Sequence, residues 1–201
     1  MNGAPDGAVG GTADGTAHGN ANGNANGNVM LIGMMGAGKT TVGRLLAGRW
    51  GWPYVDSDTE VEAATGHTVR ELFESGGEKA YRPLESAALR AAVASGTPAV
   101  IGVAGGAVLD PANRALLEGA GTVVWLRARP STLAVRAVSG THRPLIDTDP
   151  AGVLERLEAE RRPLYEALAD VVVDVDDIDA AEVAARVEAA LASPRPAGTP
   201  E

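Results

Sequence analysis

The residues from Gly33 to Thr40 have the types and the spacing of a phosphate-binding loop. The segment Gly33-Met-Met-Gly-Ala-Gly-Lys39-Thr40 matches the pattern G-x4-G-K-[ST]. Its glycines would let the backbone curl, so that successive N–H groups converge on phosphate oxygens. Lys39 would then contact the β- and γ-phosphates of a nucleotide, and the Thr40 hydroxyl would be a ligand of Mg²⁺.

The surroundings of this loop favour a true phosphate site over a chance glycine-rich turn. The loop directly follows a strand expected at Val29–Ile32 and directly precedes an amphipathic helix expected at Thr40–Trp50. The chain contains only two lysines, Lys39 and Lys79, and otherwise uses arginine. One of these two lysines stands where the loop pattern requires it.

Two aspartates follow the second expected strand, Pro53–Val55. Asp56 and Asp58 should therefore lie at the carboxyl edge of a parallel sheet, where α/β proteins bind their ligands. A carboxylate at that edge would orient or deprotonate an acceptor hydroxyl, or would hold Mg²⁺ through water. The alternative is a purely structural helix N-cap before Thr59. The sequence alone leaves both interpretations open.

Three arginines and a glycine pair add a possible anion site. Arg82 is expected to begin a helix after Gly76-Gly77, and Arg161 lies on a later helix. Arg143 lies in a polar stretch between two helices that is long enough to form a mobile cover. Gly105-Gly106 closes the third strand in a turn that lets backbone approach a ligand. Any one of these arginines would by itself be read as a surface residue, and only their joint placement points to a ligand.

The remaining elements alternate between strand-like and helix-like segments, which indicates βαβ units. We expect a three-layer α/β/α sandwich with a five-stranded parallel sheet, of the P-loop type found in nucleoside monophosphate kinases. Strands are expected at Val29–Ile32, Pro53–Val55, Ala99–Val103, Thr122–Leu126 and Val171–Val175. Helices are expected at Thr40–Trp50, Asp110–Leu117, Ser131–Val138, Gly152–Leu168 and Ala180–Leu191.

Composition limits both the domain and its partners. Residues 1–27 are rich in Gly, Asn and Ala and residues 193–201 in Pro and Gly, so both tails are expected to be disordered around a single domain at 28–192. The net charge of −9 argues against nucleic acid as a partner. The chain has no cysteine and no apolar run long enough for a membrane span. A soluble, cytoplasmic protein that is a monomer is expected.

Several motifs, taken in order, resemble the signature of the shikimate kinase family. The resemblance runs from about Val29 to Leu191 and leaves out only the tails. It is carried by the loop Gly33-Met-Met-Gly-Ala-Gly-Lys-Thr-Thr-Val-Gly-Arg-Leu-Leu-Ala47, Asp56-Ser-Asp58, Phe73 with Gly77-Glu-Lys-Ala-Tyr-Arg82, Gly105-Gly106-Ala-Val, His142-Arg143-Pro-Leu and Arg161-Arg-Pro-Leu-Tyr165. Each motif after the phosphate loop is weak by itself, but the ordered set is specific.

This resemblance implies transfer of the γ-phosphate of ATP to the 3-hydroxyl of shikimate, on the route to chorismate and the aromatic amino acids. It implies catalytic roles for Lys39, Asp58 and Arg143, the last on a lid at about 139–150. Shikimate would be bound by Asp58, Arg82, Gly105, Gly106 and Arg161. ATP would be bound by Gly36, Ala37, Gly38, Lys39, Thr40, Thr41, Arg136 and Arg143. Mg²⁺ would be held by Thr40 and, through water, by Asp56. Arginine suits the substrate carboxylate because its planar fork donates two parallel hydrogen bonds.

The chain also departs from the family pattern, which keeps two other functions open. Ala104 replaces the first glycine of the turn after the third strand, and its methyl group would crowd the site if that position required a positive φ. Gly102 replaces a small polar residue, and Tyr81 adds a hydroxyl where a phenylalanine is common. The alternatives are a kinase for another small hydroxy acid such as gluconate, and an ATP-binding module that no longer turns over.

Overall fold

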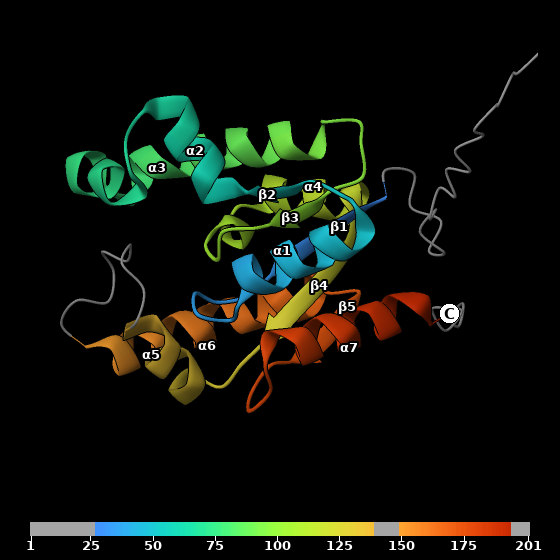
Figure 1. The fold of residues 1–201 in the computed structure, drawn as a ribbon. Coiled ribbons are helices and arrows are strands. Elements are labelled where there is room, and N and C mark those ends of the chain that lie inside the picture. Colours follow the sequence, from blue (N-terminus) through green and yellow to red (C-terminus); the bar gives the residue numbers. More distant parts are fainter. Residues whose placement is uncertain (1–26, 139–148, 194–201) are drawn as a thin grey trace, which may run out of the picture.

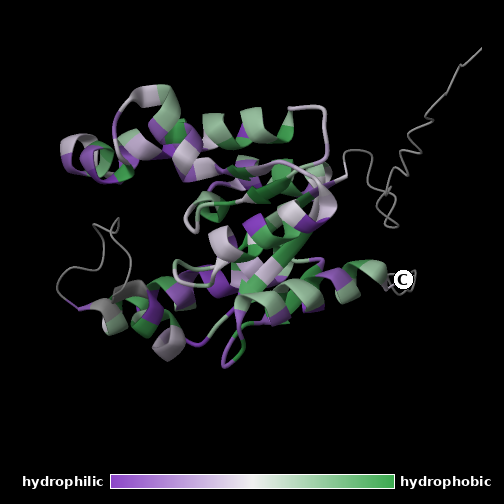
Figure 2. Ribbon diagram, in the orientation of Figure 1, coloured by the Kyte–Doolittle hydropathy of each residue, from purple (hydrophilic) through white to green (hydrophobic). Residues whose placement is uncertain are grey.

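Five parallel strands form the centre of the computed structural model, which describes residues 27–138 and 149–193 (Figure 1). The strand order is β2-β3-β1-β4-β5, and every neighbouring pair is parallel, as expected. Figure 2 shows that the strands are largely apolar, as a sheet covered on both faces requires. The strands are β1 Asn28–Ile32, β2 Tyr54–Asp56, β3 Val100–Gly102, β4 Gly121–Arg127 and β5 Val171–Asp174.

Helices cover both faces of this sheet, so the expected three-layer sandwich is confirmed. Helices α1 and α7 pack together on one face, while α4 and α6 contact β4 on the other and α3 packs against α4. The helical segments are α1 Lys39–Trp50, α2 Ser57–Thr65, α3 Val69–Val93, the 3₁₀ turn η1 Ala107–Leu109, α4 Pro111–Ala120, α5 Pro130–Val138, α6 Pro150–Leu168 and α7 Ala180–Ala192. None of the helices in the described part of the chain is long and apolar enough to cross a bilayer.

Helix α2 was expected only under the N-cap interpretation of the two aspartates, and of α3 only a helix beginning at Arg82 was expected. Helix α3 is interrupted at Gly77, whose φ of 66° and ψ of −174° are not helical, and Pro83 lies within its second half. Helical structure therefore resumes just after Gly77, and Arg82 lies inside the second half instead of beginning it. The start of α3 is marked by a capping box between Thr68 and Glu71, a signal that the sequence contains.

The expected tails and the expected lid lie almost entirely outside the residues that the structure describes. The two tails expected to be disordered lie outside the described residues, except for residues 27 and 193. The expected lid at 139–150 is described only at residues 149 and 150, and Arg143 lies outside the described part.

Candidate active site

The loop between β1 and α1 has the curled backbone that its glycines predicted. Gly33, Gly36 and Gly38 all have positive φ, at 135°, 83° and 94°. The Lys39 ammonium lies across the loop and donates to the carbonyl oxygens of Gly33 at 2.8 Å and Met34 at 3.2 Å. The loop thus places a cation and the N-terminus of α1 at the carboxyl end of β1, which is the arrangement that binds phosphate.

A pocket of about 420 Å³ opens beside this loop and brings the expected site residues together. Among the described residues of that set, Ala37 alone does not line the pocket; it is buried, and its N–H donates to the Met34 carbonyl at 3.2 Å. The expected residues that line the pocket are Gly36, Gly38, Lys39, Thr40, Thr41, Asp56, Asp58, Arg82, Gly105, Gly106, Arg136 and Arg161. Residues more than a hundred positions apart in the sequence therefore converge on one cavity.

Asp56 uses both of its carboxylate oxygens within the site. Its Oδ1 accepts a hydrogen bond from the Asp58 backbone N–H at 3.2 Å and so caps α2. Its Oδ2 accepts hydrogen bonds from the Thr40 hydroxyl at 3.1 Å and from the Tyr54 hydroxyl at 2.9 Å. The helix-cap interpretation is therefore correct for this residue, and its role in a ligand site stays a prediction.

Asp58 lies in the first turn of α2 and faces the second half of α3. Its Oδ1 accepts a hydrogen bond of 2.5 Å from the hydroxyl of Tyr81, whose ring packs 4.7 Å from that of Phe73. Burial raises the pKa of Asp58, while the Tyr81 hydrogen bond and the positive charge of Lys39 act in the opposite direction. Asp58 is therefore a nearly buried carboxylate held in a fixed orientation beside the loop.

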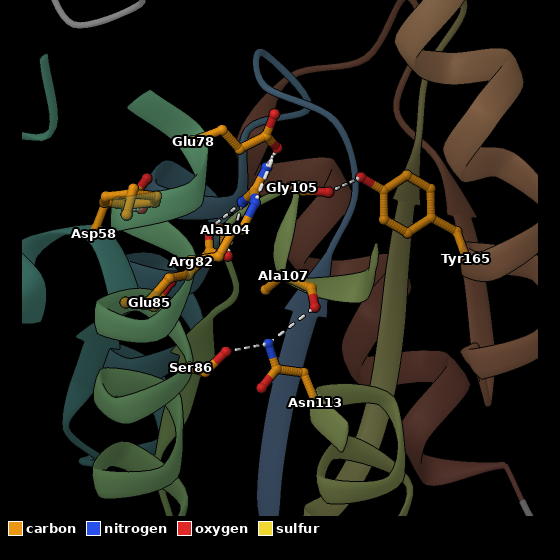
Figure 3. Close-up of polar contacts among 12 residues, drawn as sticks. Asp58, Glu78, Arg82, Glu85, Ser86, Ala104, Gly105, Ala107, Asn113 and Tyr165 are labelled. Carbon is orange, nitrogen blue, oxygen red and sulfur yellow. Dashed lines mark hydrogen bonds and ion pairs between the residues drawn. The ribbon is translucent and has the colours of Figure 1, made fainter. Parts of the chain in front are cut away.

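Arg82 is held between two glutamates of its own helix (Figure 3). Its Nε donates to Glu78 at 3.0 Å, and its Nη1 donates to both oxygens of Glu85 at 2.9 and 2.8 Å. Burial raises the pKa of Glu85 to about 7, although Arg82 opposes the shift. The guanidinium also lies directly against Gly106, where a Cβ atom would overlap it. A side chain at position 106 would therefore displace the end of the Arg82 side chain.

Arg161, on α6, contributes a buried guanidinium on the other side of the Gly105-Gly106 turn. It is 3% exposed, and its Nε–H has no hydrogen-bond partner among the described residues. One turn further along α6, the Tyr165 hydroxyl donates to the Gly105 carbonyl at 2.7 Å and anchors this turn (Figure 3). A buried donor without a partner is costly, so a ligand that accepts from Arg161 would stabilise the site.

The alanine that replaces the first glycine of the turn after β3 fits without strain. Ala104 does not have a positive φ, and its N–H donates to the Ser57 hydroxyl at 2.9 Å, so its methyl group is accommodated. Arg136, on α5, reaches the Val175 carbonyl at 2.9 Å after β5 while lining the pocket. No role was predicted from the sequence for four residues that contact the site residues: Tyr54, Glu78, Glu85 and Tyr165.

A five-stranded parallel sheet with a G-x4-G-K-T loop between β1 and α1, and a second polar cluster beside that loop, defines a P-loop kinase. The family model for shikimate kinase matches residues 35–192. The chain belongs to the shikimate kinase family.

Individual relatives agree with this membership. Shikimate kinase of Cupriavidus pinatubonensis is 41% identical over 181 residues, which cover 84% of this chain and 94% of the relative. Shikimate kinase of Moorella thermoacetica is 45% identical over 163 residues, covering 81% and 93%. The structure of shikimate kinase from Acinetobacter baumannii in complex with shikimate matches with a TM-score of 0.78 and 34% identity, covering 82% of this chain and 92% of that one.

Proposed function

We propose that this protein transfers the γ-phosphate of ATP to the 3-hydroxyl of shikimate, giving ADP and shikimate 3-phosphate. One observation carries the proposal: Arg161 is buried in the same pocket as Lys39, Asp58 and Arg82, and no group of residues 27–138 or 149–193 pairs with its Nε–H. An anion-binding loop and a separate set of arginine and carboxylate side chains thus face one cavity. A triphosphate and a small hydroxy acid are the two ligands that such a cavity suits.

The acceptor is held by complementary charges and hydrogen bonds. Arg82 and Arg161 bind the substrate carboxylate, because two guanidinium groups on either side of the Gly105-Gly106 turn offer planar donor pairs. Asp58 accepts hydrogen bonds from the substrate hydroxyls. The Gly105-Gly106 turn brings its backbone close to the ring of the acceptor. It has no side chain at position 106, where one would displace Arg82.

The nucleotide lies along the loop on the other side of the cavity. Residues 36–41 hold its phosphates, and Arg136 lies against the adenine. The donor set also fits Mg²⁺, because Mg²⁺ prefers hard oxygen ligands, retains several waters and needs only one or two protein groups besides phosphate. Thr40 Oγ1 and the Asp56 carboxylate lie within hydrogen-bond distance of each other at the start of α1. When bound, Mg²⁺ would neutralise negative charge on the β- and γ-phosphates.

Catalysis then depends mainly on placement, because phosphoryl transfer asks for little covalent chemistry from the protein. Lys39 stabilises charge on the transferred group, and Asp58 orients the acceptor hydroxyl in line with it. Asp58 is also the group within reach to accept the proton of that hydroxyl. Arg143, which lies outside the described residues, stays a predicted lid residue that would act on the phosphates.

The deciding experiment measures ADP release from the purified protein with ATP and Mg²⁺, with and without acceptor. ADP is expected only when shikimate is supplied, and gluconate is the matched control because it also carries a carboxylate and hydroxyls. Turnover with gluconate and none with shikimate would replace the proposed acceptor. ATP binding without release under either condition would indicate a module that does not turn over.

A further inference from the structure

We propose that Tyr54 is a positioning residue for the Asp56 carboxylate, and that its hydroxyl occupies the space that a side chain at position 102 would fill. This inference rests on the proposed function, because it takes Asp56 to be part of the magnesium–nucleotide site. It adds a residue that none of the sequence motifs contains.

The ring of Tyr54 is held between two glycines on neighbouring elements. On one side, a Cβ atom at Gly43 of α1 would overlap the edge of the ring. On the other side, a Cβ atom at Gly102 of β3 would overlap the hydroxyl. The Arg44 guanidinium carbon lies 6.0 Å from the ring centroid. Tyrosine at 54 is therefore accommodated by the absence of side chains at two buried positions.

This packing directs the Tyr54 hydroxyl at the Asp56 carboxylate. The Tyr54 hydroxyl donates to Oδ2 of Asp56 at 2.9 Å, the same oxygen that accepts from Thr40. The Thr40 and Tyr54 hydroxyls differ in their exposure and in their proposed roles. Thr40 is exposed on the loop side and is the proposed metal ligand, whereas Tyr54 is wedged behind the carboxylate. Tyr54 is thus the donor whose position does not depend on the nucleotide.

The geometry also predicts how residue 102 and residue 54 depend on each other. A Cβ atom at position 102 would lie 3.5 Å from Oδ2 of Asp56, so a serine hydroxyl there could reach the same oxygen. It cannot do so while the Tyr54 hydroxyl occupies that space. With phenylalanine at 54, the nearest ring carbon would still be 3.2 Å from the new Cβ, which requires a shift of only a few tenths of an ångström. Either residue can supply the hydroxyl, but not both.

The test uses the full-length protein with ADP and with Mn²⁺ as a spectroscopic substitute for Mg²⁺. Free Mn²⁺ is followed by electron paramagnetic resonance, and ADP affinity is measured separately in EDTA. Tyr54→Phe should weaken Mn²⁺ binding to the ADP complex about tenfold, as expected for loss of a hydrogen bond to a charged group. ADP affinity in EDTA should be unchanged. Tyr81→Phe is the matched control, because it removes a hydroxyl bonded to Asp58 and should leave Mn²⁺ affinity as it was.

Recovery of Mn²⁺ affinity in a double variant is a result that a general loss of stability would not produce. Gly102→Ser alone should also weaken Mn²⁺ binding, because its Cβ displaces the Tyr54 hydroxyl. The double variant Tyr54→Phe/Gly102→Ser should bind Mn²⁺ more tightly than either single variant. A double variant weaker than both single variants would overturn the proposal, as would normal Mn²⁺ affinity in Tyr54→Phe.

Two further outcomes keep the test decisive. If circular dichroism shows that Tyr54→Phe does not fold, Gly102→Ala tests the same contact with the ring retained. Its Cβ must move the hydroxyl, so unchanged Mn²⁺ affinity in Gly102→Ala would contradict the proposal. If the unmodified protein itself binds no Mn²⁺ with ADP, the proposed metal site fails, which is a different result from failure of Tyr54 alone.

Discussion

The hydroxyl of Tyr81 donates a 2.5 Å hydrogen bond to Asp58, the carboxylate proposed to meet the acceptor hydroxyl. Burial raises the pKa of Asp58, and this hydrogen bond stabilises the charged form and so lowers it. Because Tyr81 and Arg82 are adjacent, α3 both holds the Asp58 carboxylate and carries one of the two arginines proposed to bind the substrate carboxylate.

Tyr81→Phe should therefore change the pH dependence of the reaction. Without its donor, ionised Asp58 is less stable and its pKa rises further above the ordinary value. The proposed role of Asp58 needs its ionised form, so the acidic limb of the kcat/KM profile for shikimate should move to higher pH. Activity should be retained at pH values well above that limb. A profile with an unmoved acidic limb would show that Asp58 does not act in its ionised form.

Asp58→Asn should separate chemistry from nucleotide binding. The amide keeps the size of the side chain but removes the charge that is proposed to orient the acceptor hydroxyl. We expect kcat to fall roughly a hundredfold or more, with ATP affinity close to that of the unmodified protein in a calorimetric titration. A fully active variant would refute the placement of the acceptor hydroxyl beside Asp58.

Arg161→Ala should act on the acceptor and not on ATP. Loss of a buried guanidinium that is proposed to pair with the substrate carboxylate should raise the KM for shikimate about a hundredfold. The matched control is Arg162→Ala, one residue along α6, where the guanidinium pairs with Glu158 and Glu166 and is 39% exposed. Equal increases in the KM for ATP and for shikimate in Arg161→Ala would show that the carboxylate assignment is wrong.

Glu78→Gln should improve acceptor binding. Glu78 accepts from Nε of Arg82, the edge of the guanidinium that a substrate carboxylate would use, and it is half exposed. Removing its charge weakens this internal competitor, so the KM for shikimate should fall roughly two- to fivefold. A higher KM would show instead that Glu78 holds Arg82 in its binding position.

Glu85→Gln should change how stability depends on pH. Burial raises the pKa of Glu85 from its usual 4.5 to about 7, so the folded protein binds this proton more tightly than the unfolded chain does. The resulting stabilisation is complete below about pH 4.5 and is lost as pH rises through about 7, a loss of at most about 3 kcal/mol. The free energy of unfolding, measured with urea at about pH 4.5 and above about pH 7, should decrease less between these two pH values for the variant than for the unmodified protein. An identical decrease in the two proteins would show that folding does not raise the pKa of Glu85.

The sequence was sufficient for most of the fold because its strands are short, β-branched and separated by clear turns. Each expected strand differs from the observed one by at most one residue at either end. The first half of helix α3 was not predicted, because Gly76-Gly77 and Pro83 interrupt the pattern that marks a continuous helix. The capping box at Thr68 would have identified its start.

The candidate site was predictable only for residues with a recognisable motif or charge. Lys39, Asp58, Arg82 and Arg161 line one pocket as expected. The contact between Tyr54 and Gly102 joins residues far apart in the chain, and neither type suggests a role by itself. Such a pair follows from strand order, which brings β2 beside β3, and not from local pattern.

The two oxygens of Asp56 have a thermodynamic consequence. One oxygen accepts from the first turn of the helix that follows the phosphate loop, and the other holds the start of the helix that carries Asp58. Any coupling that this carboxylate carries between the nucleotide and the acceptor must change the affinities for both by the same factor, because linkage between two ligands is reciprocal. A single side chain thus joins the start of the nucleotide-side helix to the start of the acceptor-side helix.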